Sequence, residues 1–118
     1  MNKPKILVVG EDSLGVELIE VILLKDYEVE TAQDIEEIVL KVEKATPDLI
    51  ILDKIISSMN GFGMCRQLKS DERTRSIPLL IAAEKEEMKE AKDAGADYFV
   101  GKPIDVRELN AGVKSLLK

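Results

Sequence analysis

The stretch Leu49–Asp53, with the sequence LIILD, decides how this chain is expected to fold. A run of Leu and Ile without polar alternation is typical of a strand that is buried on both faces of a parallel sheet. Because Pro47 breaks the amphipathic segment before it, we expect this strand to cover Asp48 to Asp53. The carboxyl ends of strands in open α/β sheets border the crevice where ligands bind. Asp53 is therefore expected to point into such a crevice.

Strand-like and helix-like patterns alternate along the rest of the chain. The other expected strands are Lys5 to Val9, Glu28 to Ala32, Pro78 to Ala82 or Ala83, and Asp97 to Val100. The expected helices are Ser13 to Lys25, the amphipathic segment from Ile35 to Val42, Gly61 to Lys69, Glu84 to Ala94, and a last helix after Asp105. Such alternation predicts a doubly wound α/β fold with a five-stranded parallel sheet.

Several local signals refine these helices. Asn60 is the expected N-cap of its helix, and Gly95 is suited to the position just after a helix end. Asp105 followed by Glu108 resembles a capping box. The helix from Glu84 carries only a thin apolar stripe, formed by Met88 and Ala91.

Composition limits the possible functions. The 118 residues are 45% hydrophobic and 34% charged, which predicts one globular domain over residues 1–118. The chain has no His and only one Cys, Cys65, which argues against a zinc site and excludes a phosphohistidine on this chain. The net charge of −6 argues against nucleic-acid binding by this domain. We expect a cytoplasmic protein without membrane contact, because no membrane span or signal peptide pattern is present.

Acids and a lysine follow the ends of three expected strands. Glu11 and Asp53 are suited to hold Mg²⁺, which prefers oxygen ligands and usually takes one or two carboxylates. The backbone carbonyl of Ile55 is a further candidate ligand. Asp12 is a candidate as well, although capping of the first helix is the simpler explanation. Lys102 is placed to neutralise a phosphoryl group near Asp53, although it is equally explained as a solvated side chain.

The first helix is apolar over more than one face, from Leu14 to Leu24. Deep burial between the sheet and neighbouring helices explains this composition, and we favour that explanation. The alternative is a self-association surface, and hence a homodimer.

With these residues in place, the chain resembles a bacterial two-component response-regulator receiver domain from Lys5 to Leu117. The resemblance rests on ILVV (Ile6–Val9), PDLIILD (Pro47–Asp53), MNGF (Met59–Phe62), AGADYF (Ala94–Phe99) and KP (Lys102 and Pro103). It implies a flavodoxin-like fold with strand order 2-1-3-4-5 and a signalling domain that is not itself an enzyme. It also implies a partner histidine kinase or other receiver-binding protein, and an output domain or target protein.

The resemblance also implies roles for individual residues. Asp53 is the expected phosphoacceptor, and Lys102 is the expected contact of the phosphoryl group. Phe99 takes the aromatic switch position, and Ala82 or Ala83 takes the position of the switch hydroxyl. Signalling is then expected through the face from the fourth strand to the last helix.

The chain departs from the family pattern at the same site. The pair of acids after the first strand is reduced, because its first position is Gly10. No hydroxyl is available at Ala82 or Ala83, a common proline is replaced by Ser57, and the segment from Pro78 to Gly95 is short. We therefore expect weak or absent Mg²⁺ binding and a Phe99 ring that lies inward permanently.

Two other functions compete with phosphoryl acceptance. One is an interaction module of receiver type that works without phosphorylation. The other is a flavin-binding electron carrier of similar fold. The second is disfavoured because the segment Gly10–Ser13 places negative charge where a flavin phosphate would bind.

Overall fold

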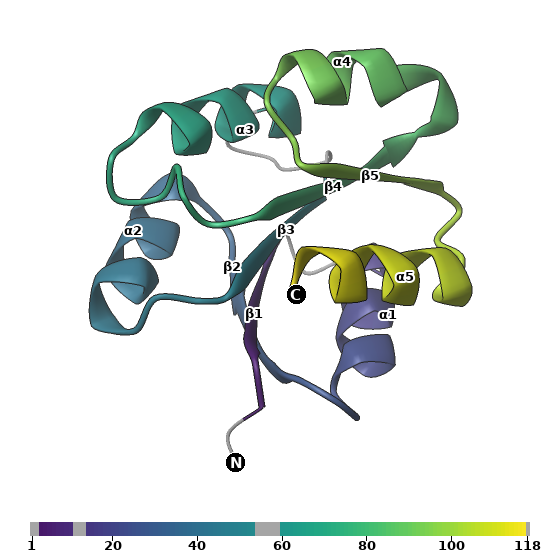
Figure 1. Cartoon of the computed structure of the whole chain (residues 1–118), viewed down its shortest axis with the longest axis horizontal. Coiled ribbons are helices and arrows are strands. Elements are labelled where there is room, and N and C mark those ends of the chain that lie inside the picture. Colours follow the sequence, from purple (N-terminus) through teal and green to yellow (C-terminus); the bar gives the residue numbers. More distant parts are fainter. Residues whose placement is uncertain (1–2, 11–13, 54–59, 118) are drawn as a thin grey trace.

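The computed structural model describes residues 3–10, 14–53 and 60–117 (Figure 1). Its strands are β1 (Lys5–Val9), β2 (Glu28–Ala32), β3 (Leu49–Asp53), β4 (Leu79–Glu84) and β5 (Tyr98–Lys102). Its helices are α1 (Leu14–Leu23), α2 (Ile35–Lys44), α3 (Gly61–Ser70), the short 3-10 helix η1 (Lys85–Glu87), α4 (Met88–Asp93) and α5 (Val106–Leu116). Within the described ranges, no helix is both long enough and apolar enough to cross a membrane.

The strands form one parallel sheet in the order β2-β1-β3-β4-β5, which confirms the predicted doubly wound fold. In Figure 1, α1 and α5 cover one face of the sheet, and α2, α3 and α4 cover the other. The central strand β3 serves both faces, because successive side chains of a strand point to opposite sides. Leu49 and Ile51 pack on the α1 and α5 side, whereas Ile50 and Leu52 pack on the α2 to α4 side.

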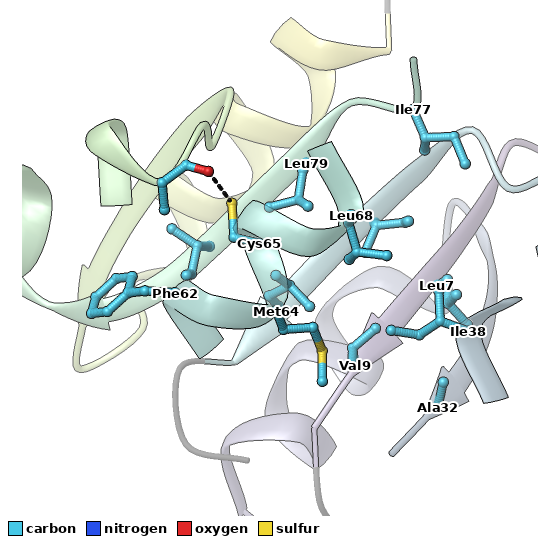
Figure 2. Packing of buried hydrophobic residues seen from close by; sticks show 14 of the residues in the cluster. Leu7, Val9, Ala32, Ile38, Phe62, Met64, Cys65, Leu68, Ile77 and Leu79 are labelled. Carbon is cyan, nitrogen blue, oxygen red and sulfur yellow. Dashed lines mark hydrogen bonds between the residues drawn. The ribbon is translucent and has the colours of Figure 1, made fainter. Parts of the chain in front are cut away.

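The core on the α2 to α4 side includes a buried cysteine (Figure 2). The Cys65 thiol donates a hydrogen bond to the carbonyl oxygen of Ala94, with an Sγ–O distance of 3.4 Å. Burial raises the pKa of Cys65 to about 11. The thiol is therefore protonated at neutral pH and acts as a packing residue between α3 and the end of α4.

Three predicted helix-end signals are confirmed. The Asn60 carboxamide oxygen accepts a hydrogen bond from the backbone N–H of Phe62 at 2.7 Å. The Asp105 carboxylate accepts one from the backbone N–H of Glu108 at 3.0 Å. Gly95 follows α4 with a φ of +100°, which only glycine adopts at little cost. Asp12 and Ser13, the predicted caps of the first helix, lie outside the described residues.

Some predicted boundaries are wrong. The first helix ends at Leu23, and the fourth strand continues to Glu84. The fifth strand begins at Tyr98 rather than Asp97 and continues beyond Val100, because Gly101 and Lys102 still pair with β4. The predicted helix from Glu84 is divided into η1 and the short α4.

One prediction about a side chain is also wrong. Glu108 does not complete a capping box with Asp105; its carboxylate accepts a hydrogen bond from the backbone N–H of Gly101 instead. In the thin apolar stripe of α4, Ala91 is buried and Met88 is 51% exposed.

The surface of α1 also differs from the favoured expectation of deep burial. Val16, Ile19 and Leu23 are buried, but an apolar row remains exposed to solvent. This row consists of Leu18, Val21 and Leu24. Self-association through this row stays a prediction.

Candidate functional site

Asp53 and Lys102 meet at the carboxyl end of the sheet. Asp53 is the last residue of β3 and is 3% exposed, and Lys102 is the last residue of β5. The Lys102 ammonium donates a hydrogen bond to the Asp53 carboxylate, with an Nζ–Oδ1 distance of 2.7 Å. This short, charge-assisted contact fixes both side chains beside the crevice. The sequence-based expectation that the two residues lie together is therefore confirmed geometrically.

The intervening strand β4 explains how the lysine reaches the acid. Asp53 pairs with Ala82, and Ala82 pairs with Val100, two residues before Lys102. Leu80 and Val100 belong to the core on the α1 and α5 side. By the two-residue period of strands, Asp53, Ala82 and Lys102 face that same side. Ala82, which carries only a methyl group, therefore lies on the strand between Asp53 and Lys102.

Gly10 lies on the other side of Asp53, at the end of β1. Its backbone N–H donates to the carbonyl oxygen of Ala32 at 2.9 Å, so the β1–β2 ladder continues regularly through this residue. An ideal Cβ at position 10 would lie 3.2 Å from the Asp53 Cβ. Position 10 is therefore an immediate neighbour of Asp53, and it contributes no carboxylate.

The two alanines of β4 face opposite sides of the sheet. Ala83 belongs to the core on the α2 to α4 side, against which Phe99 packs, whereas Ala82 has the orientation of Asp53. Both alanines are completely buried. Of the two, Ala82 pairs with Asp53 and faces the same side of the sheet, so it is our candidate for the position of the switch hydroxyl, whereas Ala83 shares its face with Phe99.

Comparisons with known proteins agree with this geometry. The model of the response regulator receiver domain matches residues 6–114. The chain belongs to this family. The chain is 39% identical over 120 residues to the alkaline phosphatase synthesis transcriptional regulatory protein PhoP of Bacillus subtilis, covering 100% of this chain and 50% of that protein. It thus spans about half the length of PhoP.

Two solved receiver structures extend the comparison. The chemotaxis response regulator CheY4 of Vibrio cholerae has a TM-score of 0.83 and 29% identity, covering 98% of this chain and 100% of that chain. The receiver domain of the sensor histidine kinase PA1611 from Pseudomonas aeruginosa has a TM-score of 0.83 at 21% identity, covering 98% of each chain. At that identity the second likeness shows the fold alone. The PA1611 domain contains a magnesium ion coordinated in its active site cleft.

Receiver domains typically bind Mg²⁺ at this site, and the described residues fit the ion only in part. Asp53 offers a carboxylate, but Gly10 offers none. No group of three His, Cys, Asp or Glu side chains in residues 3–10, 14–53 and 60–117 is arranged to hold a metal. The other predicted ligands, Glu11, Asp12 and the Ile55 carbonyl, lie outside those ranges, as does Ser57.

The surface around β5 carries two grooves that the sequence did not predict. Their volumes are about 260 and 370 Å³, and both are lined by Met88, Tyr98 and Phe99. Phe99 is half-buried, and a ring that lies inward permanently stays a prediction. The sequence signal that was available is Met88, a large apolar residue in an otherwise charged helix. The grooves give the β5 edge an apolar surface. This strand lies between α4 and α5 in Figure 1.

Proposed function

We propose that this receiver accepts a phosphoryl group on Asp53 from a partner histidine kinase in a cytoplasmic phosphorelay. The observation that supports the proposal best is the 2.7 Å contact between Asp53 and Lys102. It places the Lys102 ammonium beside the carboxylate oxygen at which charge would develop during the transfer. A carboxylate is a competent nucleophile toward phosphorus, and a cation beside it offsets the charge of the transferred group.

Lys102 has a defined part in this transfer. Before the reaction it holds the Asp53 carboxylate, whose side chain is 4% exposed, in one orientation. After the reaction its ammonium stays within reach of the new phosphoryl oxygens. Mg²⁺, when bound, would supply further positive charge, with Asp53 among its ligands. We propose that its affinity is weak, because Gly10 removes one acid.

The signalling face in this proposal runs from β4 to α5. Ala83 and Phe99 connect the strand ends to the two grooves along β5. These grooves are lined by apolar groups, with Lys92 at one and Glu108 at the other. A partner surface with an apolar centre and charged margins would fit them. The target or output domain would dock here.

Intact-mass measurement after incubation with a small acyl phosphate and Mg²⁺ tests phosphoryl acceptance. The wild-type chain should gain one phosphoryl group, and Asp53→Asn should gain none. Asp93→Asn is a matched control, because Asp93 is an exposed carboxylate on α4. If the adduct survives in Asp53→Asn, Asp53 is not the acceptor. If the wild type forms no adduct, small donors do not serve this receiver.

A second function, an interaction module that works without phosphorylation, is favoured by one observation. Ala82, which pairs with Asp53, is completely buried and carries no hydroxyl that could follow a phosphoryl group. Under this alternative, the amide NMR spectrum of residues around Phe99 and Met88 would be the same with and without the phosphodonor. Spectral changes at these residues that depend on Asp53 would contradict it.

A further inference from the structure

Val16 occupies the space beside Gly10. An ideal Cβ at position 10 would lie 2.7 Å from Cγ2 of Val16. Carbon atoms in good contact lie about 3.5–4.0 Å apart, so this distance is a severe overlap. No side chain fits at position 10 while Val16 keeps its place.

Neither residue can easily move to relieve the overlap. Val16 is 4% exposed and belongs to the core cluster that contains Ile6, Val8 and Ile51. A valine in a helix strongly prefers one χ1 rotamer, because it is branched at Cβ. The backbone of Gly10 is held in the β1–β2 ladder by its hydrogen bond to Ala32.

Glycine is not required at position 10 by its backbone conformation. Among the described residues, Gly95 is the glycine with a positive φ. A residue with a side chain is therefore compatible with the backbone at position 10, and the obstacle is the contact with Val16.

We propose that Val16 is a specificity-determining residue of this site, which keeps a carboxylate out of position 10. Asp53 is then held by Lys102 and receives no second carboxylate from position 10 for a divalent-cation site. The affinity of such a site rises with the number of charged oxygen ligands. The inference rests on the proposed function because it concerns the same Asp53. The quantities it predicts are the affinity for a divalent cation and the stability of the fold, rather than phosphoryl transfer.

A double-mutant cycle tests the steric part of the proposal without adding charge. Gly10→Ala should lower the melting temperature by roughly 5 °C in the wild-type background, because it overpacks the site. The same change in a Val16→Ala background should cost clearly less. Gly63→Ala is the control, since an ideal Cβ there meets nothing within 4 Å. Equal losses from Gly10→Ala in both backgrounds would overturn the proposal.

Mg²⁺ titration tests the consequence for the site, followed by melting temperature and by amide NMR shifts. The double variant Gly10→Asp with Val16→Ala should bind Mg²⁺ about tenfold more tightly than Gly10→Asp alone. Adding Asp53→Asn to the double variant should remove the gain. Equal Mg²⁺ affinity of the single and double variants would overturn the role of Val16.

These measurements use no phosphodonor. A wild-type chain that is never phosphorylated would contradict the proposed function and leave the role of Val16 intact. Conversely, failure of the double-mutant cycle would overturn the role of Val16 without affecting phosphoryl acceptance by Asp53.

Discussion

The Glu108 carboxylate accepts a hydrogen bond from the backbone N–H of Gly101, with an Oε1–N distance of 3.1 Å. The contact joins the first turn of α5 to β5, one residue before Lys102. It also satisfies a backbone donor of the sheet edge, because Gly101 is buried and lies on the outermost strand. The position of the lysine is therefore tied to α5 by a side chain.

Removal of this contact should destabilise the domain. We expect Glu108→Ala to lower the free energy of unfolding by about 1 kcal/mol, the usual cost of one lost hydrogen bond to a buried partner. Urea unfolding followed by circular dichroism measures the change. Arg107→Ala is the control, since Arg107 is exposed on the same turn. Equal losses in both variants would show that helix propensity, rather than the contact with Gly101, explains the effect.

The ion pair at the site gives a second prediction. Lys102→Met leaves the buried Asp53 carboxylate without its lysine, and we expect a loss of about 2 kcal/mol in unfolding free energy. In an Asp53→Asn background the same substitution should cost much less, because the buried charge is already gone. Chemical unfolding of the wild type and the three variants gives the coupling energy. Additive effects would mean that the two residues do not stabilise each other.

The limits of sequence-based prediction are visible in particular residues. Strand patterns identified β3 and its terminal Asp53, because burial on both faces leaves a continuous apolar run. The approach of Lys102 to Asp53 was expected because both residues follow strand ends at the same edge of the sheet, whereas the strand order was implied by the family resemblance. The contacts of Glu108 and Val16 did not follow, because each depends on how a helix is placed against the neighbouring strand, which the sequence pattern does not give. The exposure of Met88 did not follow either, since an apolar stripe in the sequence does not reveal that the six-residue α4 leaves this side chain largely uncovered.

A third prediction concerns the hydroxyl that β4 lacks. Ala82→Thr places a hydroxyl on the face of the sheet that Asp53 shares, and Ala82→Val adds similar bulk without it. Both should cost about 1–3 kcal/mol, because the site is fully buried. If Asp53 accepts a phosphoryl group, only Ala82→Thr should increase the phosphodonor-dependent NMR shifts at Phe99. The same increase in Ala82→Val would assign the effect to packing rather than to the hydroxyl.

The acid stability of the loop after α3 gives a fourth prediction. Hydrogen bonds from Arg73 lower the pKa of Asp71 from 3.8 to about 2. A lowered folded-state pKa contributes stability above pH 3.8 that is lost as the pH falls toward 2. Arg73→Ala should remove this pH-dependent contribution and return the NMR-detected pKa of Asp71 toward its ordinary value. Glu43→Gln is the control, because it removes the 3.8 Å contact of Arg73 with α2 and leaves Asp71 paired.

Two glycines should respond in opposite directions to the same substitution. Gly95 has a φ of +100°, and an added Cβ would lie 3.2 Å from Cγ of Lys69. Gly95→Ala should therefore cost about 1–2 kcal/mol in unfolding free energy, through backbone strain. Gly63 lies within α3 with open space around its Cα, so Gly63→Ala should stabilise by about 0.5–1 kcal/mol. Urea unfolding of both variants tests the pair, and a loss of stability in Gly63→Ala would contradict the open environment assigned to that residue.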